Sequence, residues 1–172
     1  MQLTHAEHKA GQEKFPLILV TDNIFSEANI GSMFRLADAF SIEKIIFGGN
    51  RPNLDSNRLR KTARDTHKTV PFEFSEETTS AIKDLKEEGY RIFALEITSD
   101  STALEKFNFA KESKIVLLVG NERHGIEKPI LDLSDEKIHI TMFGRNSSMN
   151  VAQAAGIAFY EITKSLLPFQ KK

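Results

Sequence analysis

Short runs of hydrophobic residues without polar alternation recur along the chain, and each is followed by a glycine or a polar turn. The clearest run is 115–119, which ends at Gly120. Such a run predicts a strand that is buried on both faces of a sheet. The same pattern predicts strands at 17–20, 44–47, 70–74, 91–95 and 137–140. Pro71 puts the strand at 70–74 at a sheet edge, because proline cannot donate a ladder hydrogen bond.

Helical periodicity fills the segments between these strands. Residues 29–40 carry a hydrophobic stripe made of Ile30, Met33, Phe34, Ala37 and Phe40. Further helices are predicted at 75–88 and 151–167, and a capping box at Thr4 predicts a helical leader within residues 1–14. This alternation predicts one α/β domain over 1–172, with its core at 15–167, a mostly parallel sheet and helices on both faces.

Length and composition narrow the possible functions. The chain has 172 residues and no cysteine, which excludes disulfides, thiolate catalysis and cysteine-ligated zinc. No hydrophobic stretch reaches about 18 residues and the first 14 residues are polar, so we expect no membrane span, no secretory signal and a cytoplasmic location. The glycine motifs of nicotinamide dehydrogenases and P-loop nucleotidases are absent from the sequence, and no histidine pattern predicts a metal site.

Ligands of parallel α/β sheets bind at the carboxyl ends of the strands, so the loops there are the first places to search. The loop after the first strand leads into a helix whose expected N-cap is Asn29. Gly31, Ser32 and Arg35 share a helix face off the hydrophobic stripe, and such a face suits an anion such as phosphate. A capped surface helix with a solvated arginine explains the pattern equally well.

The loop at 120–126 sets four polar residues between Gly120 and Gly125, directly after a buried strand. Glycines there permit close approach of the backbone to a ligand. Glu122 is suited to hold a base, a ribose or an arginine. The alternative, favoured on spacing alone, is a strand-end turn in which Glu122 pairs with a surface cation.

The loop at 141–150 ends in three residues that can cap the last helix, Ser147, Ser148 and Asn150. One N-cap needs only one of them. With Met142 and Met149 they can form a pocket for a polar ligand with an apolar body. A capped loop beside core methionines is the alternative.

Positive charge gathers in one segment of a chain whose formal net charge is −1. Residues 51–68 hold two aspartates against six cations, which are Arg51, Arg58, Arg60, Lys61, Arg64 and Lys68. Concentrated charge of this kind is the footprint of a protein that binds a phosphate backbone. A charged, solvated helix is the alternative.

Together the three loops resemble, in order, the motifs of the SpoU, or TrmH-type, branch of the SPOUT RNA methyltransferases. The first motif corresponds to 29–40, the second to 118–126, and the third to 140–155. The resemblance extends over residues 15–167. Thr141 departs from the family's usual proline, and Ala152 from a common serine.

The resemblance implies properties that residue patterns alone do not give. Family members transfer a methyl group from S-adenosylmethionine to a ribose 2′-hydroxyl of RNA. They have a C-terminal deep trefoil knot and act as homodimers with the last helix in the interface. The helix at 151–167 fits that interface because it is apolar nearly all round, and Ala152 and Gly156 would let another helix approach closely.

Roles of individual residues follow from the same resemblance. The predicted catalytic residues are Arg35, Asn29, Glu122, Ser148 and Asn150. The predicted cofactor site, formed largely by backbone, consists of Leu95, Glu96, Gly120, Ile140, Met142, Ser148 and Met149. Arg35 corresponds to the residue that activates the hydroxyl. Because arginine gives up its proton reluctantly, two roles stay open, a proton acceptor or a charged group that binds the adjacent phosphate and stabilises the forming alkoxide.

The favoured substrate is tRNA, because the sequence shows no separate RNA-binding domain, and ribosomal RNA is the alternative. A non-catalytic RNA-binding protein of the same fold is a second alternative, although it would have no need to keep Arg35, Glu122 and Asn150 together. A base methyltransferase of the wider superfamily is a third, against which the motif from Asn29 to Arg35 argues.

Overall fold

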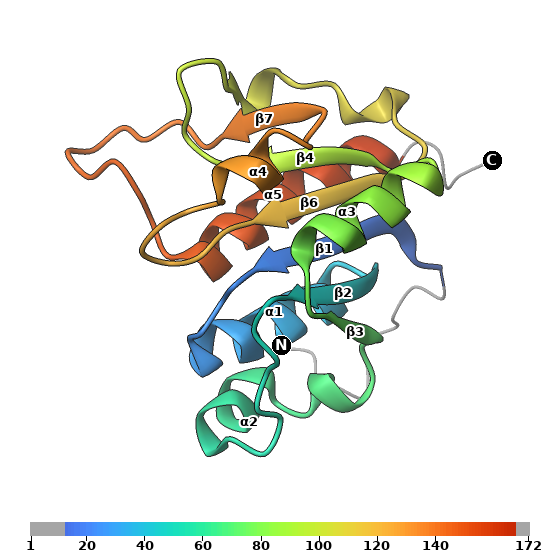
Figure 1. Ribbon diagram of the computed structural model, residues 1–172, viewed down its shortest axis with the longest axis vertical. Coiled ribbons are helices and arrows are strands. Elements are labelled where there is room, and N and C mark those ends of the chain that lie inside the picture. The colour runs from blue at the N-terminus through green and yellow to red at the C-terminus, as the bar shows by residue number, and fades with distance from the viewer. Residues whose placement is uncertain (1–12, 168–172) are drawn as a thin grey trace, which may run out of the picture.

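A parallel sheet of seven strands forms the centre of the molecule, in the order β3-β2-β1-β6-β4-β7-β5 (Figure 1). The strands are β1 (Phe15–Asp22), β2 (Ile42–Gly48), β3 (Phe72–Ser75), β4 (Arg91–Leu95), β5 (Thr102–Ala103), β6 (Ile115–Val119) and β7 (Glu136–His139). The computed structural model describes residues 13–167, so the predicted leading helix lies outside the described residues. All six predicted strands are confirmed, and β3 lies at an edge as Pro71 indicates. Two-residue β5 was not predicted, because it is too short to show a pattern.

Helices cover both faces of this sheet, as predicted. On one face lie α1 (Glu27–Ala39) and α5 (Val151–Leu166), and on the other lie α3 (Thr78–Glu87) and α4 (Lys128–Leu131). Leu17 and Leu19 of β1 belong to the first core, whereas Ile18 and Val20 belong to the second. Burial on both faces explains why this strand has no polar alternation.

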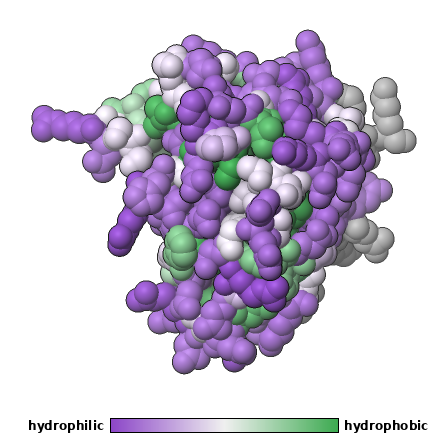
Figure 2. All heavy atoms as spheres, in the orientation of Figure 1, coloured by the Kyte–Doolittle hydropathy of each residue, from purple (hydrophilic) through white to green (hydrophobic). Residues whose placement is uncertain are grey.

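The face with α3 and α4 is turned toward the viewer in Figure 1. Figure 2 shows that surface as mostly hydrophilic, with hydrophobic side chains in small, separated groups. This face therefore offers polar surface around a few hydrophobic side chains. On the opposite face, short 3-10 helices contact α1 or α5, and they lie at Thr66–Lys68, Leu104–Lys106 and Phe109–Lys111.

The prediction that Asn29 caps the first helix is wrong. Helix α1 begins earlier, and its N-cap is Ser26, whose hydroxyl accepts a hydrogen bond from the Asn29 backbone N–H at 3.4 Å. The side chain of Asn29 is therefore free for other contacts. Serine and asparagine are both good caps, so composition alone could not choose between them.

The prediction that the helix face at Gly31 is open to an anion is also wrong, because helix α2 (Asn57–Ala63) covers Gly31. A Cβ atom on Gly31 would lie 2.0 Å from Thr62 Oγ1 and 2.4 Å from the Leu59 carbonyl oxygen. Glycine is thus required for the contact between α1 and α2. A helix in this segment was offered only as the alternative to a phosphate-binding segment, because only Leu59 and Ala63 of the seven residues of α2 are buried and they leave little periodic pattern.

Helix α5 differs from the prediction at Gly156. Gly156, expected to admit a helix of another subunit, instead packs against Leu36 of α1 in the same chain, 3.1 Å from the position of a Cβ atom. Ala152 is buried as well. The helix also has an exposed stripe, in which Ile157 and Tyr160 are 40% and 56% exposed. It is therefore not enclosed on all sides within one chain.

Candidate active site

Strands β1, β6, β4 and β7 are neighbours in the sheet and run parallel. The loops that follow them therefore meet at one edge of the sheet. The long segment between β7 and α5, orange in Figure 1, extends beyond that edge before returning to the start of α5. Two adjoining hollows lie among these loops.

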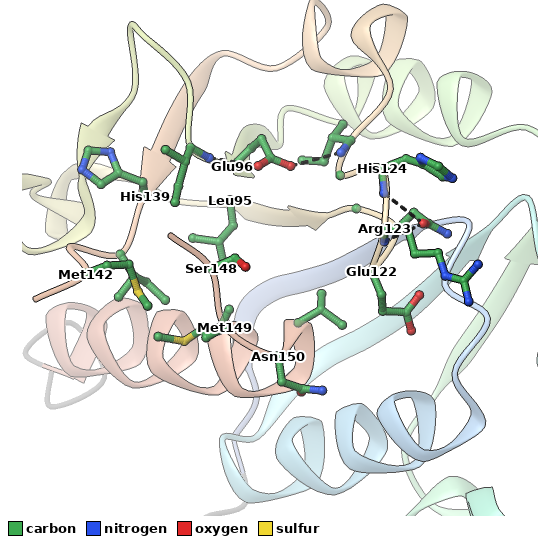
Figure 3. Close-up of a pocket in the computed structure, with 18 residues that line it drawn as sticks. Leu95, Glu96, Glu122, Arg123, His124, His139, Met142, Ser148, Met149 and Asn150 are labelled. Carbon is green, nitrogen blue, oxygen red and sulfur yellow. Dashed lines mark hydrogen bonds between the residues drawn. The ribbon is translucent and has the colours of Figure 1, made fainter. Parts of the chain in front are cut away.

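The first hollow measures about 590 Å³, within the range of small-molecule sites. Its walls come from the ends of β4, β6 and β7 and from the start of α5 (Figure 3). All the residues predicted to bind the cofactor line it, namely Leu95, Glu96, Gly120, Ile140, Met142, Ser148 and Met149. The sequence prediction therefore named residues that the fold brings together from three loops.

A chain of hydrogen bonds links the three loops that resemble family motifs. The Asn29 side-chain N–H donates to Glu122 Oε1 at 2.9 Å, and the Asn150 side-chain N–H donates to Asn29 Oδ1 at 2.9 Å. Asn29 thus uses both ends of its amide, one toward the loop after β6 and one toward α5. A side chain without paired donor and acceptor could not make this bridge.

Glu122 is held as a carboxylate. Burial raises the pKa of its side chain, but hydrogen bonds from Asn29 and from the backbone N–H groups of Ser26 and Phe25 outweigh that effect and hold the pKa below its ordinary value. The Ser26 N–H donates to Oε1 at 3.1 Å. The alternative in which Glu122 pairs with a surface cation is wrong, because its partners in the described residues are N–H groups of the loop after β1 and of α1.

Asn150 has two functions at the start of α5. Its Oδ1 accepts hydrogen bonds from the Ala152 and Gln153 backbone N–H groups at 3.0 and 3.2 Å, which makes it the N-cap. Its side-chain nitrogen meanwhile donates to Asn29. Of the three capping candidates, Asn150 therefore takes this position, which leaves the exposed Ser147 and Ser148 uninvolved in the cap.

The loop at 120–126 is closed on itself and tied to β4. Reciprocal backbone hydrogen bonds join Asn121 and Gly125 at 3.0 and 2.9 Å. Gly125 has a φ of +69°, which glycine adopts without strain. The Glu96 carboxylate accepts from the Ile126 N–H at 3.1 Å, so this side chain supports the loop, a role beyond the predicted backbone contact.

Two supporting residues were missed by the sequence prediction. The Asn121 side chain donates to the Asn23 carbonyl at 2.7 Å, a second tie between the loops after β6 and β1. Asp22, 1% exposed at the end of β1, accepts from Thr78 Oγ1 at 2.9 Å and from the Glu127 N–H at 3.4 Å. The one signal available for Asp22 was a charged residue at the end of a buried strand.

The second hollow measures about 740 Å³. It is lined by Phe25, Ser26, Asn29, Arg58, Asn121, Glu122, Arg123, His124 and Asn150. Several of these residues also line the first hollow, so the two share a wall built from Glu122, Asn150 and the loop around them. Phe25, Arg123 and His124 were not predicted as site residues.

Arg35 is the one predicted catalytic residue outside both hollows. It is exposed on α1 and makes no side-chain hydrogen bond or ion pair within residues 13–167. Its neighbour Leu36 packs against α5. The structure thus brings Asn29, Glu122, Ser148 and Asn150 together within one chain, but not Arg35.

The predicted RNA-binding cations are dispersed on and beside α2. Arg58 lines the second hollow, whereas Arg60 pairs with Asp55 and Lys68 pairs with Asp65. The Arg51 guanidinium lies 4.5 Å from the centre of the Phe74 ring. Lys61 and Arg64 are exposed.

Across the described part of the chain, no helix is both long and hydrophobic enough to cross a membrane. Within residues 13–167, no cluster of three histidine, aspartate or glutamate side chains is arranged to hold a metal ion.

Comparison with known proteins identifies relatives over most of the chain. A family model described as the SpoU rRNA Methylase family matches residues 16–160. An uncharacterized tRNA/rRNA methyltransferase of Mycobacterium tuberculosis is 30% identical over 149 residues, which cover 86% of this chain and 52% of that protein. The tRNA (guanosine(18)-2′-O)-methyltransferase of Aquifex aeolicus is 28% identical over 148 residues, covering 84% of this chain and 67% of that protein. The chain thus spans about half the length of the mycobacterial relative.

Solved structures share the fold. The A. aeolicus TrmH/SpoU tRNA modifying enzyme has a TM-score of 0.82 at 25% identity, over 92% of this chain and 79% of that one. A structure titled for the 2-OH methylation of C/U34 on tRNA has a TM-score of 0.76 at 26% identity, over 88% of this chain and 97% of that one. An AdoMet-bound rRNA methyltransferase from Sinorhizobium meliloti has a TM-score of 0.82 at 23% identity, over 90% and 58% of the two chains, a likeness of fold.

Proposed function

Because the chain belongs to the SpoU rRNA methylase family, we propose that it transfers a methyl group from S-adenosylmethionine to a ribose 2′-hydroxyl of RNA. The observation that carries the proposal is the hydrogen-bonded chain from Glu122 through Asn29 to Asn150. It joins residues from all three motif-like loops beside a hollow of cofactor size. Structural support of the sheet alone would not need this polar bridge at its edge.

The residues of the first hollow fit S-adenosylmethionine. Leu95, Met142 and Met149 offer apolar contacts for a nucleoside, and Gly120 lines the same hollow while its missing side chain lets the loop close against Gly125. The carboxylates of Glu96 and Glu122 balance a positively charged ligand in a partly enclosed site. When bound, this cofactor supplies a methyl group activated by its positive sulfur.

The protein's own residues must then orient the ribose and help to remove its proton. Glu122 fixes Asn29, and Asn29 fixes Asn150 at the wall shared by both hollows. Orientation of this kind can supply much of the rate, because reactants are held in reactive geometry. Because Arg35 lies outside both hollows of its own chain, it would have to act from the partner subunit of the homodimer proposed below. There it would accept the hydroxyl proton, or stay charged and stabilise the alkoxide as it forms.

For the RNA substrate we propose tRNA. The support is similarity to a tRNA-modifying enzyme of A. aeolicus and to the tRNA C/U34 enzyme, 97% of which this chain covers. Ribosomal RNA is the second candidate, because the 23S rRNA (guanosine(2553)-2′-O)-methyltransferase of Bacillus subtilis is 25% identical over 145 residues.

The deciding experiment maps 2′-O-methyl groups in total RNA from cells with and without this protein. We expect a ribose methyl group to disappear from one tRNA position and to return when the purified protein acts on that RNA with S-adenosylmethionine. Loss of a ribosomal RNA site would choose the second candidate. Identical maps, or loss of a base methyl group, would contradict ribose methylation.

Reversal of charge in the basic segment is expected to weaken RNA binding. Changing Arg58, Arg60 and Lys61 to glutamate should lower affinity and flatten its dependence on salt, because fewer counterions are released from the RNA. The measurement is a series of binding titrations at increasing salt. An unchanged slope would show that RNA binds to another surface.

A homodimer through α5 is part of the proposal. Its support is the exposed stripe of α5, where Ile157 and Tyr160 lie between the polar Gln153 and Lys164. We expect the wild type to sediment at twice the chain mass of 19.4 kDa, and Ile157→Glu to sediment as a monomer. A wild-type monomer at all concentrations would contradict this arrangement.

We further propose the deep C-terminal knot and a cytoplasmic location. Support for the knot is the insertion of β7 between β4 and β5, two strands that precede it in the chain. A chain pulled from both ends would then stay shorter than its full extended length, because a knot tightens instead of opening. Extension of the pulled chain to its full length would contradict the knot.

The cytoplasmic location is tested by cell fractionation. Recovery of the protein in the membrane fraction would contradict it.

A further inference from the structure

An exposed aromatic ring lies at the second hollow on a fixed piece of backbone. Phe25 is 62% exposed and lines this hollow. Its N–H faces Glu122 Oε2 at 3.5 Å, and the next N–H, that of Ser26, donates to Oε1 at 3.1 Å. Hydrogen bonds to Glu122 therefore hold the backbone that carries the Phe25 ring. The ring itself is mostly exposed and contributes little to the core.

Two cations from different elements line the same hollow as this ring. Arg58 comes from α2 and Arg123 from the loop after β6, and both are exposed and line the same hollow. Neither takes part in an ion pair within residues 13–167. In Figure 3 the Arg123 guanidinium lies beyond Glu122, on the side away from Ser148 and Met149.

Glu122 is the single carboxylate among the residues that line this hollow. Phosphate is repelled from the Glu122 wall and attracted to Arg58 and Arg123. The Glu122 wall, with the amides of Asn29 and Asn150, instead suits a sugar with hydroxyl groups. The charges thus give an occupant with phosphate, sugar and a flat ring one preferred orientation.

We propose that the second hollow binds the target nucleotide of a single-stranded RNA segment, with its base stacked on Phe25. The phosphates that flank this nucleotide contact Arg58 and Arg123. Its ribose lies at the wall that the second hollow shares with the first. This inference rests on the proposed function, since it names the part of the RNA substrate that enters this site. Stacking tolerates all four bases, so Phe25 supplies affinity and position, not base identity.

The test measures binding of a fluorescent, single-stranded RNA of random sequence to the full chain with S-adenosylhomocysteine present. Phe25→Ala should weaken binding about tenfold, because stacking on the ring is lost, while Phe25→Trp should retain it. Arg58→Ala and Arg123→Ala should each lower the slope of log affinity against log salt by about 0.7. The matched controls are Phe143→Ala, an aromatic that is 96% exposed outside both hollows, and Lys83→Ala, an exposed cation on α3.

Wild-type affinity in Phe25→Ala overturns the inference, as does an equal loss in Phe143→Ala or an absence of RNA binding by the wild type. A changed sedimentation coefficient in Phe25→Ala without a change in RNA affinity would assign the ring to a protein contact and overturn it too. Methyl transfer is assayed separately. If the Phe25→Ala protein binds RNA normally and still transfers methyl groups, only this inference is contradicted. If RNA binding depends on Phe25 but the wild type transfers no methyl group, the proposed function is contradicted.

Discussion

Arg35→Ala is expected to lower methyl transfer by at least about a hundredfold while leaving the affinity for S-adenosylmethionine nearly unchanged. Arg35 lines neither hollow within one chain, so the cofactor does not depend on it. Both open roles, proton acceptor and stabiliser of the alkoxide, require the guanidinium in the reaction. Arg35→Lys should fail as well, because an ammonium group does not reproduce the planar fork of donors.

Single-turnover assays measure the loss of methyl transfer, and calorimetry measures the affinity for the cofactor. The matched control is Asp38→Ala, which removes an exposed charge one turn further along α1. It should leave both quantities unchanged. Wild-type turnover by Arg35→Ala would rule out both roles, and lost cofactor binding would instead indicate a structural part for this arginine.

Gly120→Ala is expected to abolish cofactor binding. A Cβ atom on Gly120 would lie 2.2 Å from the Gly125 carbonyl carbon and 2.3 Å from the Ile126 nitrogen. Both are backbone atoms, which cannot turn away as a side chain can. The loop that carries Glu122 must shift, and the free energy of unfolding should fall by about 1–3 kcal/mol, as for other overpacked sites.

Calorimetry with S-adenosylmethionine and urea unfolding measure the two effects of Gly120→Ala. Gly144→Ala is the matched control, because a Cβ atom there meets nothing within 4 Å and the glycine has no positive φ. It should bind and unfold like the wild type. If Gly120→Ala binds the cofactor normally, the tight closure of this loop is not needed for the site.

Much of the fold was predictable because burial leaves a local mark on the sequence. The run at 115–119 has no polar residue because both faces of β6 are covered, and the stripe in 29–40 matches the buried face of α1. The residues predicted for the first hollow came from the family resemblance, and each lies at the end of a strand, in the loop that follows it or before α5. Strand ends are visible in a sequence, so these positions could be named.

Contacts between distant segments leave no such mark. Nothing near Asn29 shows that Ser26 would cap α1 and free the amide to bridge Glu122 and Asn150. Gly31 seemed open because the helix that covers it comes almost thirty residues later. Phe25 and Arg58 likewise meet only in the folded chain. These features depend on tertiary packing, which overrides local preference.

The wall shared by the two hollows has a thermodynamic consequence. Glu122 and Asn150 border both spaces, so a ligand in one that stiffens this wall alters the ordering cost for a ligand in the other. This coupling is reciprocal. If the methyl donor changes the affinity for RNA by some factor, RNA must change the affinity for the methyl donor by the same factor. If the methyl donor and the RNA bind as proposed, the bridge through Asn29 would couple the two binding events through the residues that both hollows share.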